Sequence, residues 1–172
     1  MHTITDASLN KLVEQVAEIL GKNNHKLVTA ESCTGGWVAK CCTDLSGSSA
    51  WYDRGYVTYS NEAKHDSLNV SHQTLDQHGA VSQAVAEQMA LGAITHSQAT
   101  ISVAITGIAG PNGGSEAKPV GTVWIAWAHK KHVLMCHCFS FNGDRESIRR
   151  QAVYQALVGI IENARDSPLS MG

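Results

Sequence analysis

The segment from Glu31 to Gly36, which reads ESCTGG, contains the first residues whose types and spacing could do chemistry. A short strand pattern (26–30) precedes it and an apolar helical repeat follows it, so Ser32 is predicted to lie at a tight turn from strand to helix. Backbone N–H groups converge at such a turn, and with the dipole of the helix they can stabilise the oxyanion of an acyl transfer. The alternative is an ordinary capped helix, with Ser32 or Thr34 as its N-cap.

A serine nucleophile needs a base, because a free hydroxyl is a weak nucleophile. The chain has nine histidines, but none lies in a catalytic motif, and they are interpreted as surface residues. Lys64 is the other candidate, within a short helical pattern (61–68) that directly follows a strand pattern (55–60). A lysine can act as a base where burial or a neighbouring charge lowers its pKa. The alternative is a solvated helix lysine, since lysine is rarely buried.

Two further segments could hold a ligand. The glycine-rich loop 106–114 follows a buried strand pattern, and its backbone N–H groups can come close to a ligand. It matches neither a P-loop nor a dinucleotide-binding fingerprint. Arg145 and Arg149 are four residues apart near the start of the last helix, so they share a face and could grip a phosphate. The alternatives are a plain surface loop and a solvated charged face.

The five cysteines do not match a zinc motif or a disulfide framework. Cys41 and Cys42 fit the apolar stripe of a helix, while Cys136 and Cys138 point to one face of a strand. Free cysteine packs as a small hydrophobe, so both pairs are interpreted as packing residues. Cys33, next to Ser32, is interpreted as a buried spacer, with nucleophile as its alternative role.

Hydrophobic periodicity predicts the elements that position these residues. Helical patterns cover 9–20, 37–45, 61–68, 82–94 and 148–160, and strand patterns cover 26–30, 55–60, 100–105, 120–128 and 133–141. Asp6 and Gly21 are expected to start and end the first helix, and Ser82 to cap the fourth. The last two strands form a hairpin through 129–132. Helices interleaved with strands, together with this hairpin, predict an α/β fold: three α/β/α layers with a mixed central sheet.

Length and composition restrict the class of protein. The chain has 172 residues, 43% of them hydrophobic, and is expected to form a single domain over 1–172 with a core from about 9 to 164. A formal charge of −2 argues against a nucleic-acid partner. No stretch approaches the roughly 20 apolar residues that span a membrane, and the N-terminal stretch lacks a signal-peptide pattern. With an odd number of cysteines, these features predict a cytoplasmic protein with no membrane partner.

Six stretches, taken together, resemble the CinA C-terminal domain family, and in particular its stand-alone nicotinamide-nucleotide amidases. They are 29–36 (TAESCTGG), 57–64 (VTYSNEAK), 78–82 (HGAVS), 106–111 (TGIAGP), 118–123 (KPVGTV) and 143–145 (GDR). Their order and spacing match from about residue 9 to residue 164, which is nearly the whole chain. Several long motifs in the right order are far more specific than any one of them.

The resemblance implies hydrolysis of nicotinamide mononucleotide to nicotinic acid mononucleotide and ammonia, a salvage step in pyridine nucleotide metabolism, with no metal or organic cofactor. It implies a Ser–Lys mechanism with Ser32 as nucleophile and Lys64 as base, and Tyr59 as a further catalytic residue. The substrate-binding residues that we expect are Thr34, Gly35, Gly36, Thr106, Gly107, Gly110 and Arg145. Enzymes of this size and class commonly form homo-oligomers, which we expect here. The alternatives are a non-catalytic nucleotide-binding paralogue and a metal-dependent hydrolase that uses histidines and cysteines.

Overall fold

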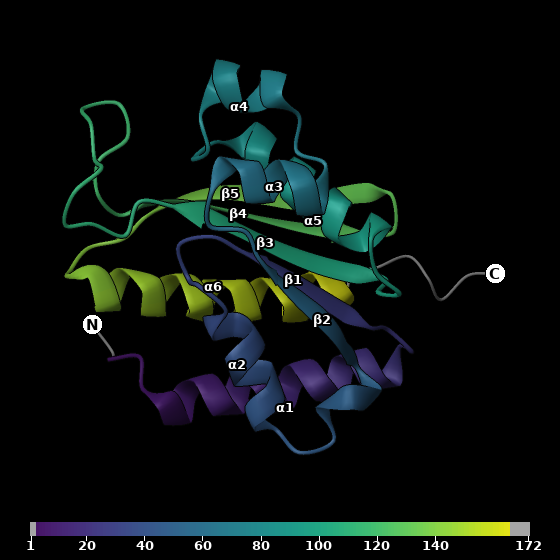
Figure 1. The fold of residues 1–172 in the computed structure, drawn as a ribbon. Helices are drawn as coiled ribbons and strands as arrows, with labels where there is room; N and C mark the ends of the chain where they lie inside the picture. The colour runs from purple at the N-terminus through teal and green to yellow at the C-terminus, as the bar shows by residue number, and fades with distance from the viewer. Residues whose placement is uncertain (1–2, 166–172) are drawn as a thin grey trace.

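A computed structural model describes residues 3–165, which form a five-stranded sheet between two layers of helices (Figure 1). The elements are α1 (Asp6–Lys22), β1 (Leu27–Glu31), α2 (Trp37–Asp44), a 3-10 turn (Ser48–Ala50), β2 (Tyr52–Val57), α3 (Asn61–Leu68), α4 (His72–His78), α5 (Gln83–Thr95), β3 (Ile101–Gly107), β4 (Thr122–His129), β5 (His132–Ser140) and α6 (Arg145–Arg165). The strand order is β2-β1-β3-β4-β5. Strands β1, β2 and β3 are parallel, while β4 and β5 are antiparallel, which confirms the predicted mixed sheet.

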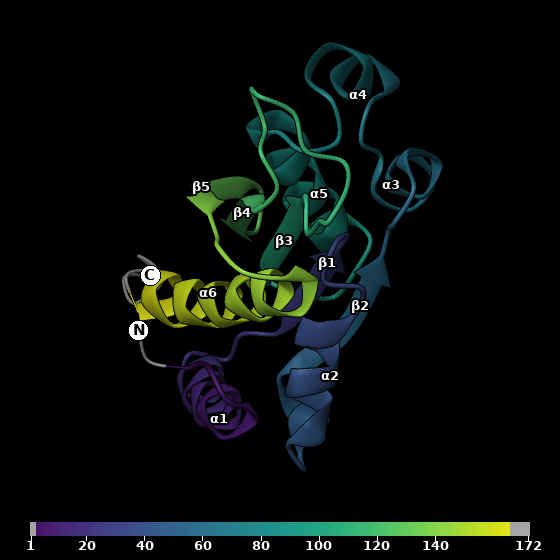
Figure 2. The same cartoon turned by 90° about the vertical axis from the view of Figure 1, so that its left-hand side faces the viewer.

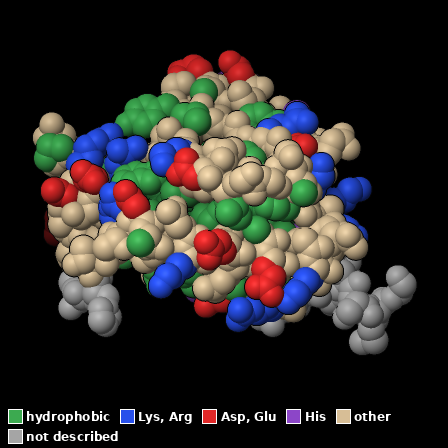
Figure 3. Space-filling model, turned by 90° about the horizontal axis from the view of Figure 1, so that it is seen from below, with side chains coloured by type: hydrophobic (Ala, Val, Ile, Leu, Met, Phe, Trp, Pro, Cys, Tyr) green, Lys and Arg blue, Asp and Glu red, His purple; other side chains and the backbone are tan. Residues whose placement is uncertain are grey.

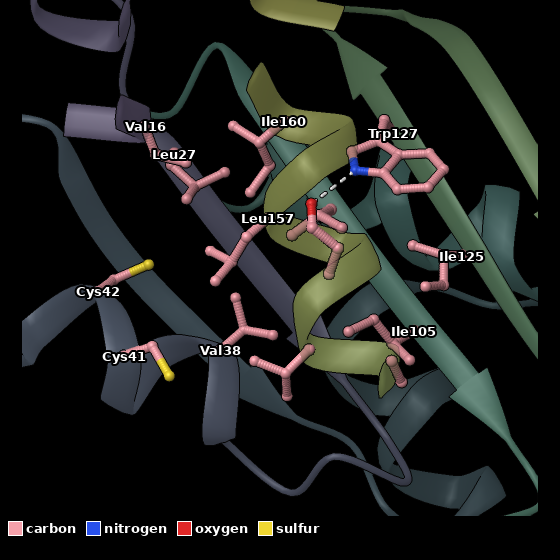
Figure 4. Packing of buried hydrophobic residues seen from close by; sticks show 14 of the residues in the cluster. Val16, Leu27, Val38, Cys41, Cys42, Ile105, Ile125, Trp127, Leu157 and Ile160 are labelled. Carbon is pink, nitrogen blue, oxygen red and sulfur yellow. Dashed lines mark hydrogen bonds between the residues drawn. The ribbon is translucent and has the colours of Figure 1, made fainter. Parts of the chain in front are cut away.

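Helices α1, α2 and α6 cover one face of the sheet, and α3, α4 and α5 cover the other (Figure 2). On the first face the predicted apolar stripe of α1 is buried, as is that of α6. Figure 4 shows Leu157 and Ile160 of α6 packed against the sheet, where the indole nitrogen of Trp127 donates to the Ala156 carbonyl at 3.0 Å. Cys41 and Cys42 are buried in the same core, which confirms their interpretation as packing residues.

On the second face, α5 lies close to the end of α3. A Cβ atom at Gly92 of α5 would lie only 1.9 Å from the carbonyl oxygen of Leu68, the last residue of α3. Only glycine permits this approach, because real Cβ atoms do not come so near another heavy atom. The contact therefore determines how closely α3, the helix that carries Lys64, approaches α5.

The first helix begins one residue earlier than predicted. Thr5, not Asp6, is its N-cap, and Thr5 exchanges hydrogen bonds with Ser8 in a capping box. The helix also continues past Gly21 to Lys22, where Asn23 forms the C-cap. The local capping geometry at both ends replaces the residues that the sequence pattern suggested.

Two other elements differ from the sequence-based expectation. Strand β2 runs from Tyr52 to Val57, whereas the sequence pattern predicted 55–60. It ends before Ser60 because the Ser60 hydroxyl caps α3 by accepting from the Ala63 N–H. Helix α4 was not predicted, since it buries only Leu75 and so leaves no apolar stripe in the sequence. The predicted N-cap of α5 is confirmed, with the Ser82 hydroxyl accepting from the Val85 N–H.

The surface of the α1 side carries acidic and basic side chains side by side rather than one basic patch (Figure 3). Across residues 3–165, the helices are too short or too polar to cross a membrane.

Candidate active site

A cavity of about 280 Å³ opens at one edge of the sheet, where the parallel strands β1, β2 and β3 end. The carboxyl ends of parallel strands meet at a common edge, and ligands of open α/β sheets bind there. Its lining is Ser32, Cys33, Tyr59, Lys64, Ala80, Val81, Thr106, Gly107, Ile108, Ala109, Gly110, Asn112, Gly113 and Arg145. Seven of the ten residues that the sequence assigned to a site therefore lie around one cavity.

The turn after β1 presents Ser32 to this cavity. Its two glycines, Gly35 and Gly36, have φ angles of 62° and 96°, which other residues adopt only with strain. Gly36 is the N-cap of α2, so the chain reverses from strand to helix within five residues. Ser32 itself is only 8% exposed, and its N–H is tied to the Ile105 carbonyl of β3.

Lys64 reaches Ser32 from α3. Its Nζ lies 3.1 Å from the Ser32 Oγ and 2.9 Å from the carbonyl oxygen of Thr58, to which it donates. The side chain is only 1% exposed, although lysine is among the residues least often buried. A buried amine within hydrogen-bond reach of a hydroxyl is the arrangement that a Ser–Lys pair requires.

Burial lowers the pKa of the Lys64 ammonium below its ordinary value, because the charged form loses its hydration. A charged Cys33 thiolate would act in the opposite direction, as a smaller effect. Burial in turn raises the pKa of the Cys33 thiol to about 11, so the thiol stays protonated at neutral pH. A protonated thiol is a weak nucleophile, which favours Ser32 over Cys33 in that role. Cys33 is only 6% exposed, which confirms that it is buried.

Glu31, the last residue of β1, is fully buried, and its carboxylate lies at the start of α2. Its carboxylate accepts hydrogen bonds from the N–H groups of Val38 and Ala39 and from the hydroxyl of Thr34. The first free N–H groups of α2 are therefore used inside the protein and do not face the Ser32 cavity. A charged residue at the end of an apolar strand pattern was the sequence signal for this role.

Three predicted binding residues are not among those that line the Ser32 cavity. Thr34, Gly35 and Gly36 line a neighbouring hollow of about 360 Å³, together with Asp6, Trp37, Lys40, Arg149 and Arg150. The Thr34 hydroxyl points to Glu31 instead of a cavity. Arg149 lies on this side as well, so the structure puts Arg145 and Arg149 at different openings although they are four residues apart.

Arg145, the first residue of α6, lies at the rim of the Ser32 cavity. Its guanidinium donates to the Gly110 carbonyl at 2.7 Å and to the Tyr59 hydroxyl at 3.0 Å. Tyr59 is 62% exposed and stands at the mouth of the cavity. Thr106 is buried and donates to the Ala80 carbonyl at 2.8 Å, which links β3 to the cavity wall. The glycine-rich loop and Arg145 thus lie together, as the sequence predicted.

None of the histidines in residues 3–165 lines the cavity. Two of them, His25 and His129, are buried rather than solvated, so their interpretation as surface residues was wrong. They pack edge to face with ring centroids 5.3 Å apart, and burial is the main cause that lowers the pKa of both. Cys138 is exposed and Cys136 is half-buried on the edge strand β5, so the packing interpretation is wrong for Cys138. The described part of the chain brings no three His, Cys, Asp or Glu side chains together around a metal position.

The sequence profile described as "CinA C-terminal domain" matches residues 9–164. The chain is 53% identical over 154 residues to the nicotinamide-nucleotide amidohydrolase PncC of Escherichia coli strain K12, which covers 90% of this chain and 93% of that protein. It is 48% identical to the protein of the same name from Pseudomonas putida, over 90% of this chain and 96% of that one. The crystal structure of the competence/damage inducible protein CihA from Agrobacterium tumefaciens has a TM-score of 0.87 and 42% identity, covering 94% of this chain and 98% of that chain.

Proposed function

The chain belongs to the CinA C-terminal domain family, and from this membership we propose that it deamidates nicotinamide mononucleotide to nicotinic acid mononucleotide and ammonia. Two relatives that match it over nine tenths of its length are named nicotinamide-nucleotide amidohydrolases. The observation that carries the proposal is the buried Lys64 amine 3.1 Å from the Ser32 hydroxyl, at the wall of an open cavity. A covalent Ser–Lys mechanism uses such a pair.

In this mechanism, neutral Lys64 takes the proton of Ser32 while Oγ attacks the carboxamide carbon, and the carbonyl electrons move to oxygen. Backbone N–H groups of the turn after β1 stabilise this oxyanion. Collapse of the intermediate breaks the C–N bond, and the lysine ammonium gives its proton to the departing ammonia. Water then attacks the acyl ester and passes a proton to Lys64, which returns it to Ser32. The exposed hydroxyl of Tyr59 is a second candidate donor to the leaving amine.

The carbonyl of Thr58 supports the role of Lys64 as a base. A neutral amine has two N–H donors and one lone pair, in tetrahedral directions. One N–H is bound by the Thr58 carbonyl at 2.9 Å, which restricts rotation of the amine while Ser32 lies at 3.1 Å. With the amine held in this way, the lone pair of the deprotonated form can face the serine proton.

The experiment that tests the proposed function measures ammonia released by the purified protein from nicotinamide mononucleotide, with free nicotinamide and NAD as parallel substrates. We expect release from the mononucleotide at a rate that a chelator leaves unchanged, because the mechanism uses no metal. Loss of the rate in chelator would favour a metal-dependent hydrolase. Binding of the mononucleotide with no ammonia release would identify a non-catalytic paralogue.

Replacing Arg145 with alanine is expected to raise KM for the mononucleotide by about 10- to 100-fold, with a smaller effect on kcat. The physical reason is the loss of charge-assisted hydrogen bonds to the phosphate, each worth roughly 1.5–3 kcal/mol. Arg145 is the cation that lines the cavity beside the glycine-rich loop, at a hydrogen-bond distance from Gly110 and Tyr59. Steady-state kinetics on the mononucleotide and on the riboside, which lacks the phosphate, would measure the effect. Equal efficiency of the native protein on both substrates would contradict a phosphate site.

A further inference from the structure

Arg149 of α6 contacts the turn that carries Ser32 from the side opposite the cavity. Its Nε donates to the Cys33 carbonyl at 2.9 Å, and its terminal nitrogen donates to the Thr34 carbonyl at 3.0 Å. The guanidinium also lies 5.4 Å from the centre of the Trp37 ring, in the range of a cation–π contact. Arg149 is half-buried. Its guanidinium is held on two sides, by the turn and by the tryptophan.

These two bonds determine where the N–H groups of the turn point. A trans peptide is planar, and its C=O and N–H point in opposite directions. Since the Cys33 carbonyl points to Arg149, the N–H of Thr34 points away from Arg149. The Ser32 carbonyl accepts from the Gly35 N–H, so the N–H of Cys33 points away from the inside of the turn.

The hydrogen bonds of the turn leave few donors for a substrate. The N–H of Ser32 binds Ile105, that of Gly35 binds Ser32, and those at the start of α2 bind Thr34 or Glu31. Within residues 3–165, no protein acceptor is found for the N–H groups of Cys33, Thr34 and Gly36. Thr34 and Gly36 line the neighbouring hollow, whereas Ser32 and Cys33 line the cavity. Arg149 borders that hollow, so the Thr34 N–H, which points away from Arg149, points away from the hollow as well. The free donors nearest to Ser32 along the chain are thus those of Cys33 and Thr34.

We infer that Arg149 is a positioning residue that fixes the peptide planes of this turn, so that the N–H groups of Cys33 and Thr34 form the oxyanion hole. This inference rests on the proposed function and names the donors that it needs. A donor fixed in advance stabilises the transition state without reorganisation. Arg149 acts through the backbone and does not touch the substrate, unlike a phosphate-binding arginine.

A residue that positions the oxyanion donors and a residue that binds the substrate phosphate have different effects on the kinetics. We expect Arg149→Met to lower kcat for nicotinamide mononucleotide by about 10- to 100-fold, since oxyanion donors act in the transition state, and to leave KM within about twofold. Arg149→Lys keeps a charged donor group but has one nitrogen in place of the two that bind the carbonyls, and it should restore part of kcat. A rise in KM at unchanged kcat would overturn the inference and indicate a phosphate ligand instead.

Arg150→Met is the matched control. Arg150 lies 4.9 Å from the centre of the same Trp37 ring and borders the same hollow, but it pairs with Asp6 and Glu146 and not with the turn. We expect it to keep the native kcat. Thermal denaturation of both variants gives the structural effect, and a loss of stability in Arg149→Met with native kcat would overturn the inference.

A second measurement needs no substrate. A fluorophosphonate probe forms a phosphonyl ester with a serine Oγ and releases fluoride, through an oxyanionic transition state that the same N–H groups stabilise. We expect labelling of Ser32 to slow in Arg149→Met and to stay at the native rate in Arg150→Met. Equal labelling rates in all three proteins would overturn the role of Arg149 alone. A native protein that labels but releases no ammonia would overturn the substrate assignment alone.

Discussion

Replacing Ser32 with alanine is expected to lower kcat for deamidation by about 10⁴- to 10⁶-fold, the range seen when a covalent nucleophile is removed. The reason is that Lys64 would have no hydroxyl to deprotonate and the acyl-enzyme would not form. The fold is expected to remain intact, because the backbone hydrogen bond of Ser32 to Ile105 and the Glu31 bonds to α2 do not involve the lost oxygen. The measurement is single-turnover ammonia release, with circular dichroism and thermal denaturation for the fold.

Cys33→Ala is the control for this variant. The buried thiol, whose pKa is raised to about 11, is expected to contribute nothing to acyl transfer, so the loss of the thiol should cost far less turnover than the loss of the hydroxyl. Mass spectrometry of the quenched reaction should find the acyl group on Ser32 in this variant. Near-native turnover by Ser32→Ala would contradict the assignment and point to Cys33 or to an activated water.

Lys64→Arg is expected to be as inactive as Lys64→Ala, although it keeps the positive charge. Arginine stays protonated in proteins, so it cannot accept the proton of Ser32. Lys64→Met tests the fold, since it keeps most of the volume of a side chain that is only 1% exposed and removes a buried ionisable group. We expect the methionine variant to be inactive and at least as stable as the native protein in thermal denaturation. An arginine variant with substantial activity would rule out Lys64 as the base.

The same residue sets the expected pH dependence. The base form of Lys64 is the neutral amine, and burial lowers the pKa of Lys64, so more of the amine is neutral at a given pH than for a free lysine. The ratio kcat/KM should therefore rise with pH through this lowered pKa and level off below the pKa of an ordinary lysine. A profile measured with nicotinamide mononucleotide checks this, and a limb that rises only at the ordinary lysine pKa would contradict burial of the active base.

Periodicity predicted those parts of the fold that bury a regular stripe. Helices α1, α5 and α6 have such stripes, and the strands β3 and β4 are largely buried. The structure confirms these elements, and the more exposed edge strand β5, within a few residues of their predicted bounds. Helix α4 and the limits of β2 could not be predicted in this way. The helix buries a single leucine, and the strand ends where a serine caps the next helix, which is a local hydrogen bond rather than a hydrophobic signal.

The candidate site, too, could be predicted only in part from the sequence. The resemblance to the family implied that Ser32, Lys64 and Arg145 share a site, and the structure places all three around one cavity. The motifs could not predict that Arg149 faces away from this cavity. Its position depends on contacts with Trp37 and with two carbonyls more than 110 residues earlier in the chain, and such non-local contacts leave no pattern along the sequence.

The close approach of α5 to α3 has a consequence for attempts to make this protein more thermostable. Glycine in the middle of a helix is the usual target of such design, since alanine there is worth roughly 1 kcal/mol in helix propensity. At Gly92 the added methyl group would meet the Leu68 carbonyl, one helical turn beyond Lys64 on the same helix. The displaced helix would carry the Lys64 amine away from Ser32, so a design rule that considers only distance from the cavity would damage turnover here. A stabilised variant of this protein should therefore keep Gly92.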